Sequence, residues 1–455
     1  MTRSGRLAGH QARLGSRKED RQASRHLPVL NRRLVLPALL ILIALIQTSC
    51  LQNLIDLAVQ GTPTIIDVSF ADPTRQTTSS GTEANGTGST SATAATTTDP
   101  AAVTVVPTAP AADFARQVGQ ILLDGLRKEY AEISLDAAVR NRKIPESSVQ
   151  ETINRVYSIY RDLYSRYADF YYLNGSINVS YTLLQGETKY LESMTIQPQY
   201  WPILRDLTAI ERNRLLSQVD AAADTLASQI RAETGQPWRQ LLLLHDYLVR
   251  NIVYDSTGNQ DTNQAISALL DHSTLCQGYA QAFQLIGQKL GIDVRLIGGE
   301  YEGVGHAWNL VCLDGQFYHV DVTHDDPTPD GGPDRPVEHV HFLRSDSQMQ
   351  TTHSWETADY PACPSDGAFY YRELLLTANS RDSITEKLDQ FISGIDFTSQ
   401  ETALLELLYT GSDLPDSQTL QAMLQKALDP ASAGHTVYYR NYLSKGVVLV
   451  EITPG

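Results

Sequence analysis

An Asp-Gly pair at positions 314–315 constrains the fold of this chain more than any other short feature. It separates two runs of residues that favour β-strands, HAWNLVCL and QFYHVDV. An Asp-Gly pair between such runs is typical of a two-residue hairpin loop, because both loop positions need a positive φ angle. The sequence therefore predicts two adjacent antiparallel strands joined at this pair.

The hairpin loop fixes which side chains share a face of the two strands. If the loop has two residues, Leu313 lies opposite Gln316, and counting outward places Trp308 opposite Asp321. His306 is two residues from Trp308, so it shares a face with Asp321 as its diagonal neighbour, within reach of that carboxylate. A three-residue loop would shift the register by one residue and separate the two side chains, so the prediction depends on the loop type.

The stretch STLCQGYA, residues 273–280, begins a predicted helix. Ser273 or Thr274 is a suitable N-cap, and Cys276 lies on the apolar face of the first turn. The N-terminus of a helix carries partial positive charge and unpaired N–H groups, which favour a thiolate and can hold an oxyanion. Cysteine is also common as a small buried residue, so the position of Cys276 alone leaves both roles open.

A cysteine, a histidine and an aspartate together supply the groups of an activated thiol. Cys276 would be the nucleophile, His306 the base beside it, and Asp321 the carboxylate that orients the imidazole. The hairpin register joins His306 to Asp321. Periodicity does not show that the helix of Cys276 packs on the hairpin.

The segments LCQGYAQAFQLIGQKLGIDVRLIGGE and GHAWNLVCLDGQFYHVDVTHDDP resemble the transglutaminase-like superfamily. In that family a Cys-Gly-Tyr-Ala helix, a His-Ala-Trp-Asn strand and a Tyr-x-x-Asp strand present a catalytic triad on a papain-like core. The upstream HDYLVRNIVYD and the downstream HFLRSDSQMQTTHSW resemble the flanks of bacterial members, so the resemblance covers about residues 205–363. It implies that Cys276 is the nucleophile, His306 the base and acid, and Asp321 the orienting carboxylate.

The resemblance implies a class of reaction but not one substrate. Thiolate attack on a protein or peptide carboxamide gives a thioester, after which an amine acceptor gives cross-linking and water gives deamidation or peptide hydrolysis. The alternative is a non-catalytic surface module that holds an extended peptide in the same cleft. Trp308 either binds substrate as a wall of that cleft or is a plain core residue. His324 departs from bacterial relatives, which often have tryptophan there.

Residues 1–50 have the composition of an export and anchoring segment. Nine Lys/Arg in the first 33 residues precede LVLPALLILIALI, an uncharged run of 13 residues followed by QTSC. This run is short for a membrane span but has the length of a signal-peptide core. Ser49 before Cys50 fits a lipoprotein cleavage box, whereas Gln47 fits poorly. We predict a membrane-anchored protein on the extracellular side, with lipid on Cys50; an uncleaved signal anchor and secretion are alternatives.

The remaining sequence divides into a linker and three folded modules. Residues 51–112 are rich in Ser, Thr, Ala and Pro and are predicted to be a disordered linker. Residues 113–204 and 364–455 are predicted to be small α+β modules on either side of the transglutaminase-like domain, 205–363. The predicted fold class is α+β, with a helix packed on an antiparallel sheet in the central domain.

The flanking modules give several local predictions. Helical periodicity after Ser147 predicts a helix, and Asn174-Gly175 predicts a turn between strands. Residues Ala368–Ala378 and KGVVLVEI near the C-terminus are typical of strands. Helices are predicted around Ile384–Ile395, Gln400–Tyr409 and Ser417–Ala427.

The charge of the chain excludes one class of partner. Its formal net charge is -16, and the basic residues concentrate in the N-terminal segment, so the body is strongly acidic. A surface that binds nucleic acid needs clustered Lys and Arg, so we predict no nucleic-acid partner. The expected partners are a protein or peptide substrate and the membrane, while the oligomeric state is left open.

No metal or cofactor is predicted from the sequence. The three cysteines after residue 50 show no zinc-ligand spacing, and the calcium sites of animal transglutaminases lie outside the matched motifs. Cys312 is expected in the core and Cys363 in a loop. Five histidines are expected to be structural: His319, His324, His339, His341 and His353. Four acids are expected to be solvated in loops: Asp325, Asp326, Asp330 and Asp334.

Overall fold

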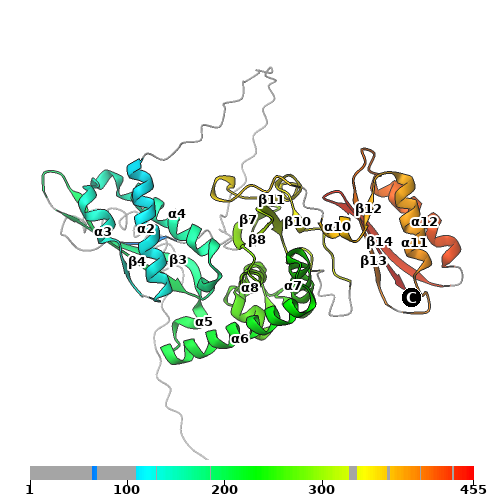
Figure 1. The fold of residues 1–455 in the computed structure, drawn as a ribbon, viewed down its shortest axis with the longest axis horizontal. Coiled ribbons are helices and arrows are strands. Elements are labelled where there is room, and N and C mark those ends of the chain that lie inside the picture. The colour runs from blue at the N-terminus through cyan, green and yellow to red at the C-terminus, as the bar shows by residue number, and fades with distance from the viewer. Residues whose placement is uncertain are drawn as a thin grey trace, which may run out of the picture. The chain divides into compact units, whose positions relative to one another are not determined.

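The computed structural model describes part of the chain in detail (Figure 1). The described residues are 64–68, 109–129, 131–184, 186–326, 336–365, 369–399, 401–432 and 435–455. The predictions for residues 1–50, including Cys50, and for most of the linker lie outside them. Among the described residues, no helix is both long enough and apolar enough to cross a membrane.

The N-terminal module is an antiparallel sheet with helices packed against it. The sheet has the strand order β1-β3-β4-β2, and helix α2 packs on α4. Its strands are β1 (Thr64–Val68), β2 (Ile133–Ser134), β3 (Leu173–Leu184) and β4 (Tyr190–Tyr200), and its helices are α2 (Ala109–Arg127), α3 (Asp136–Val139) and α4 (Val149–Arg166). Residues Thr64–Val68, which we expected in the linker, form a strand that pairs with β3.

The predicted turn at Asn174-Gly175 is wrong. Both residues lie inside β3, and the pairing of β3 with β4 shifts register between Leu173 and Ile177. Gly175 has a φ of 80°, a conformation that suits glycine in a strand irregularity as well as in a hairpin loop. The Asn-Gly signal therefore marked a bulge in a continuous strand.

The central domain packs one helix on a five-stranded antiparallel sheet, as predicted. The sheet order is β10-β9-β8-β7-β11, and helix α8 contacts β7 and β8 as well as helices α6 and α7 (Figure 1). The strands are β7 (Val294–Tyr301), β8 (Val304–Leu313), β9 (Gln316–Val320), β10 (Phe342–Arg344) and β11 (His353–Ser354). The helices are α5 (Pro202–Arg205), α6 (Ala209–Glu233), α7 (Pro237–Asn251), α8 (Cys276–Lys289) and α9 (Asp346–Met349).

Helix α8 is buried on almost every side. All residues from Cys276 to Gly287 are buried, including three glutamines. Gln277 and Gln281 each donate a hydrogen bond to the Tyr164 hydroxyl of α4, at 3.1 and 2.7 Å. The polar side chains of α8 thus contact the N-terminal module, and the two regions share one continuous hydrophobic core.

The hairpin register is the predicted one. Leu313 pairs with Gln316, and Asn309 pairs with Val320. Continuing this register by one residue places Trp308 beside Asp321. Asp314 and Gly315 have φ angles of 51° and 79°, so both loop positions are left-handed as a two-residue loop of this type requires.

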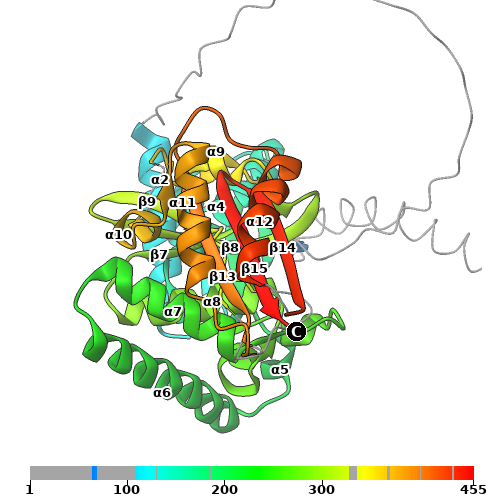
Figure 2. The same ribbon diagram turned by 90° about the vertical axis from the view of Figure 1, so that its right-hand side faces the viewer.

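The C-terminal module packs helices α11 and α12 against a sheet of order β12-β13-β15-β14 (Figure 2). The strands are β12 (Thr377–Ala378), β13 (Ala403–Tyr409), β14 (Val437–Ser444) and β15 (Val447–Pro454). The helices are α10 (Phe369–Glu373), α11 (Arg381–Ser393) and α12 (Ser417–Ala431). The strand predicted over Ala368–Ala378 is wrong for its first half, which forms α10.

The predicted helix at Gln400–Tyr409 is also wrong, because this segment contains strand β13. Leu405 and Leu407 join the core under the helices, whereas Leu408 belongs to a second cluster with Tyr371. A strand buried on both faces gives a continuous apolar run, and periodicity alone does not separate such a run from a helix.

Candidate active site

Cys276 is the first residue of α8 and is 3% exposed. The predicted cap by Ser273 or Thr274 is wrong, because the N-cap position is Leu275 and these two residues form the short strand β6 (Ser273–Thr274). The carboxamide oxygen of Asn263 accepts hydrogen bonds from the backbone N–H groups of Gln277 and Gly278, at 2.9 and 3.3 Å. The helix N-terminus is therefore capped by a residue from a preceding loop.

A close contact between β6 and α8 fixes the position of Cys276. β6 pairs in parallel with β5 (Val253–Tyr254), and the Thr274 hydroxyl donates to the carbonyl of Thr262 at 2.6 Å. A Cβ atom on Gly278 would lie 1.8 Å from the Thr274 hydroxyl oxygen and 2.9 Å from the Gln264 carbonyl oxygen. Position 278 therefore requires glycine.

His306 lies between Cys276 and Asp321. Its Nε2 atom is 2.9 Å from Asp321 Oδ2, and the Cys276 thiol lies near enough to the ring to raise its pKa. All three side chains are nearly inaccessible, with 3%, 4% and 0% of Cys276, His306 and Asp321 exposed. The structure thus brings together the three residues that the sequence predicted as a triad.

The charge on His306 is stabilised by its neighbours. Burial opposes the imidazolium form, but the Asp321 carboxylate and the hydrogen bonds to Asp321 and Cys276 outweigh it and raise the pKa of His306 to about 10. The pKa of Asp321 is held well below its ordinary value, because the charge of His306 and the hydrogen bonds from His306 and His324 outweigh its burial. A protonated imidazole thus lies beside the Cys276 thiol.

Asp321 also binds two further imidazoles. His324 Nδ1 and His353 Nε2 lie 2.7 and 3.0 Å from Asp321 Oδ2, and the His324 backbone N–H donates to Oδ1 at 3.3 Å. Burial lowers the pKa of His324 and lowers that of His353 to about 4, so both rings are neutral at pH 7. A neutral ring donates one N–H, and we expect both to donate it to Asp321.

Sequence reasoning did not connect these two histidines to Asp321. His324 is three residues after Asp321, which was an available local signal. His353 reaches the site because β11 pairs with the end of β7, where His353 lies opposite Tyr301. That pairing has no local sequence signal, so the contact of His353 was not predictable in the same way.

Trp308 lies in the core of the domain. It is 1% exposed, and its indole N–H donates to His319 Nδ1 at 2.9 Å. The indole stacks on the His306 imidazole with 5.6 Å between ring centroids and 14° between planes. The indole thus supports the His306 ring, and contact of Trp308 with substrate stays a prediction.

Tyr254 is a candidate donor near the thiol. It lies on β5, half-buried, and its partner across the pair is Thr274, two residues before Cys276. Burial and then the nearby charge of Cys276 raise the pKa of Tyr254, so its hydroxyl keeps its proton. A phenol in this position is able to donate a hydrogen bond toward developing negative charge.

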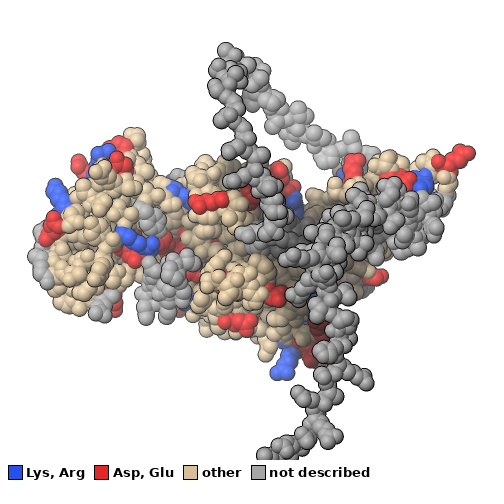
Figure 3. Space-filling view, turned by 180° about the vertical axis from the view of Figure 1, so that it is seen from behind, with Lys and Arg blue, Asp and Glu red and all other residues tan. Residues whose placement is uncertain are grey.

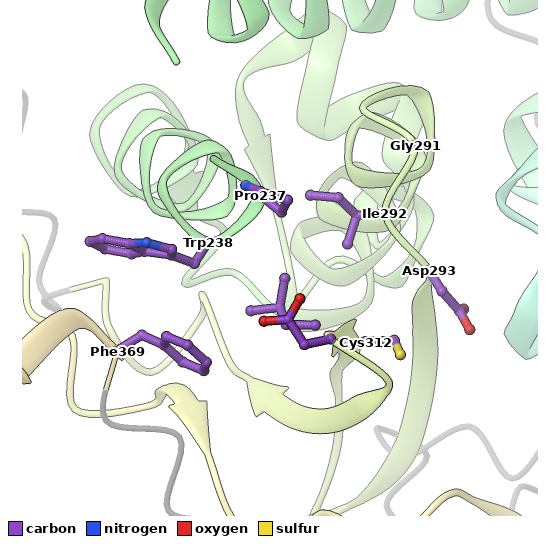
Figure 4. A pocket seen from close by; sticks show the side chains of 9 residues that line it. Pro237, Trp238, Gly291, Ile292, Asp293, Cys312 and Phe369 are labelled. Carbon is purple, nitrogen blue, oxygen red and sulfur yellow. The ribbon is translucent and has the colours of Figure 1, made fainter. Parts of the chain in front are cut away.

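A surface pocket of about 210 Å³ lies elsewhere in the domain (Figure 4). Trp238, Cys312 and Phe369 contribute to its lining, whereas the predicted triad does not. Cys312 is thus partly exposed beside this pocket, while Cys363 is buried in a cluster with Trp308 and Met349.

The prediction of solvated loop acids is wrong for Asp325 and Asp326. They are 0% and 6% exposed, and Asp325 is bound by His245 and His341. Buried carboxylates need charged or hydrogen-bonding partners, and histidines supply them here. Asp330 and Asp334 lie outside the described residues.

On the face seen in Figure 3, acidic side chains are scattered over the described surface.

Three groups among the described residues have ligand atoms close enough to share a metal ion. They are His306, Asp321, His324 and His353; His245, Asp246 and His339; and His319, Asp346 and Cys363. Sequence spacing did not reveal these groups, because each combines residues from separate elements.

Residues 224–322 match the family model of the transglutaminase-like superfamily. Over these residues the chain is similar to that superfamily. The match includes Cys276, His306 and Asp321, and it agrees with the resemblance seen in the sequence motifs.

Comparison with solved structures finds similar proteins at low identity. A TGase crystal structure has 12% identity and a TM-score of 0.26, covering 44% of this chain and 59% of that one. The periplasmic domain of TgpA from Pseudomonas aeruginosa, bound to ethylmercury, has 17% identity and a TM-score of 0.19, covering 33% of this chain and 72% of that one. The chain thus spans less than two thirds of the first of these. A comparison with curated proteins finds no match.

Proposed function

We propose that this protein is a cysteine enzyme that acts on protein or peptide carboxamides through a thioester on Cys276. The observation that carries the proposal is the position of His306, which is hydrogen-bonded to Asp321 and lies beside the Cys276 thiol. The match of residues 224–322 to the transglutaminase-like superfamily supports the same class of chemistry.

The proposed first half-reaction forms the thioester. The Cys276 thiolate attacks the carboxamide carbon, and a C–S bond forms as the carbonyl oxygen takes up negative charge. The protonated His306 then gives its proton to the nitrogen, the C–N bond breaks, and ammonia or an amine leaves. Asp321 holds the imidazole in position throughout, and Tyr254 is a candidate donor to the oxyanion.

The second half-reaction releases the acyl group. An amine or a water molecule attacks the thioester, His306 accepts the proton of the attacking group, and the C–S bond breaks to regenerate Cys276. An amine gives cross-linking, whereas water gives deamidation or peptide hydrolysis. The proposed chemistry uses no cofactor.

A comparison of cysteine variants tests the proposal. Cys276→Ala should abolish ammonia release and incorporation of a fluorescent amine into a glutamine-containing protein such as casein, whereas Cys363→Ala and Cys312→Ala should retain them. Mass spectrometry of the unmodified protein after acid quenching should detect an acyl adduct on Cys276. Equal signals from Cys276→Ala and the unmodified protein would reject this function.

The second candidate function is a non-catalytic module that binds an extended peptide. Iodoacetamide labelling separates the two functions, because an imidazolium–thiolate pair reacts faster than an ordinary thiol at neutral pH. A labelling rate at Cys276 equal to that of free cysteine would favour the binding module. Cys312 offers an internal reference, since its thiol is partly exposed and its pKa is raised by burial.

We also propose that the protein is exported and held at the outer face of a membrane by its N-terminal segment. The support is the basic head followed by a 13-residue apolar run and Cys50. Labelled palmitate should enter the full chain and should be lost in Cys50→Ala but not in Cys363→Ala. Labelling that survives Cys50→Ala would exclude lipidation at that residue.

A further inference from the structure

A second buried cluster lies apart from Cys276 and contains five side chains, in which carboxylates alternate with histidines. In order of contact they are Asp325, His245, Asp246, His339 and Glu406. The four links are His245 Nε2 to Asp325 at 3.1 Å, His245 Nδ1 to Asp246 at 3.1 Å, His339 Nε2 to Asp246 at 2.9 Å and His339 Nδ1 to Glu406 at 2.8 Å. The residues come from α7, from residues 321–326 and 336–341, and from β13. We call these five residues the histidine–carboxylate array.

The centre of the array has the geometry of a metal site. His245 Nδ1 and His339 Nε2 both point at Asp246 Oδ1, and the three atoms lie within 4.8 Å of one another. An ion bound at about 2.0–2.2 Å from each ligand, at angles near 90–110°, separates the ligand atoms by roughly 2.8–3.6 Å. The observed N–O distances of 3.1 and 2.9 Å already lie in that interval.

The outer nitrogen of each ring is oriented by a carboxylate. Asp325 and Glu406 are 0% and 3% exposed, and they contact the ring nitrogens that do not face Asp246. Glu406 also accepts the backbone N–H of His339 at 2.7 Å, and Asp325 accepts the His341 ring at 2.8 Å. Histidines that bind metals almost always donate their second N–H to such a partner, which fixes the tautomer and the ring orientation.

We propose that His245, Asp246 and His339 bind a divalent transition-metal ion of the zinc class, with Asp325 and Glu406 orienting the two histidines. Two imidazoles and one carboxylate favour zinc or a similar ion over calcium or magnesium, which prefer oxygen ligands. The Asp246 side chain is 27% exposed while that of His245 is 0% exposed, so access for the ion is from the side of Asp246. The ion joins α7 to the segment before β10 and, through Glu406, to β13.

The other two groups of ligand atoms lack this support. In the Asp321 group, the second ring nitrogen of His353 contacts the Thr352 hydroxyl at 2.9 Å, and His306 contacts the Cys276 thiol. In the third group, the second nitrogen of His319 accepts from Trp308, and only one histidine is present. Neither group combines two histidines with two outer carboxylates, so the array around Asp246 is the better ion site.

Metal binding to the full chain tests the proposal. The protein, without any histidine tag, is stripped with a chelator and dialysed against excess Zn²⁺, and bound zinc is measured by elemental mass spectrometry and titration calorimetry. We expect about one tightly bound ion per chain. Asp246→Asn should abolish that binding, and Glu406→Gln should weaken it by about 10–100-fold. Asp346→Asn and Cys276→Ala are matched controls that should retain it.

Cobalt substitution gives a second readout that needs no variant to fold. Co²⁺ bound by nitrogen and oxygen should give visible bands without a thiolate charge-transfer band in the near ultraviolet. A thiolate band would place the ion at Cys363 or Cys276 and reject the proposed ligands. Failure of the unmodified protein to retain zinc, or equal retention by a folded Asp246→Asn variant, would also reject the site. Neither result would bear on the thioester chemistry of Cys276.

Discussion

Two of the buried groups of histidines and carboxylates among the described residues differ in the partner of the second ring nitrogen. At the candidate active site, His306 contacts Asp321 on one side and the Cys276 thiol on the other. In the histidine–carboxylate array, His245 and His339 each lie between two carboxylates. A ring between a carboxylate and a thiol is suited to moving a proton to and from substrate, whereas a ring between two carboxylates is suited to holding charge in place.

The two groups also differ in how the carboxylate is used. Three imidazoles converge on Asp321, but only His306 has a strongly raised pKa, while those of His324 and His353 are lowered. One carboxylate thus stabilises one charged ring and accepts neutral donors from two others. Every array histidine has two carboxylate partners, so no ring there is left to react with a substrate group.

The largest expected effect comes from Asp321→Asn. The asparagine amide cannot stabilise the His306 imidazolium or accept the same hydrogen bonds, so we expect kcat/KM to fall by about 10⁴-fold. Asp346→Asn removes the carboxylate of another His–Asp pair, His319–Asp346 at 2.8 Å, and is the matched control. It should keep activity within about threefold, because His319 contacts Trp308 and not the thiol.

Steady-state kinetics and circular dichroism of both variants provide the measurement. Similar losses in the two folded proteins would mean that any buried His–Asp pair in the domain has the same effect on rate. The special role of Asp321 would then be rejected.

The sequence predicted the parts of the site that depend on local signals. The Asp-Gly loop determined the register, and the register placed His306 beside Asp321. Helical periodicity located α8 and put Cys276 at its start. Each of these predictions needed only neighbouring residues and the regular geometry of a strand or a helix.

The parts that were not predicted depend on contacts between distant segments. Asn263 caps α8 from a loop, and His353 reaches Asp321 through the pairing of β11 with β7. Asp325 looked like a loop acid because acidic residues are usually solvated, yet two histidines make its burial favourable. Strand β13 looked like a helix because both of its faces are covered.

The position of Cys276 depends on the close packing of β6 against α8, and Gly278→Ala is expected to disturb it. The added methyl group would overlap the Thr274 hydroxyl and approach the Gln264 carbonyl, so the start of α8 must move. We expect a loss of about 1–3 kcal/mol in the free energy of unfolding, together with a loss of activity of about 100-fold.

Gly235→Ala is the matched control, because a Cβ atom there meets no atom within 4 Å. Chemical denaturation and kinetics on the two variants measure the difference. If Gly278→Ala were as stable and as active as Gly235→Ala, the contact between β6 and α8 would not position the thiol.

The raised pKa of His306 predicts an alkaline limit to activity. The proposed mechanism needs His306 protonated to release the amine, and its folded pKa of about 10 lies above the ordinary value of 6.5. The protonated ring, and the stability that it contributes, should therefore persist at neutral pH and be lost as the pH rises through about 10. A pH profile of kcat/KM should fall above that value.

In Asp321→Asn, the pH above which the residual activity falls should move down toward the ordinary pKa of histidine. An unchanged limb in that variant would show that a different group sets it. Neither His324 nor His353 is expected to produce this limb, because burial lowers both of their pKa values.

The smallest effect should come from His324→Leu, which removes one of the three imidazoles on Asp321. His324 is the most exposed of them, with 26% of its side chain accessible. Its ring stacks on that of Tyr301, with 3.6 Å between the ring centroids. Loss of one neutral hydrogen bond costs about 0.5–1.5 kcal/mol, so kcat/KM should fall by about tenfold or less. His324→Gln keeps a donor in the side chain and should recover part of the loss. A fall as large as that of Asp321→Asn would instead place His324 in the chemical step, and the distinction between one reacting ring and two supporting rings would no longer hold.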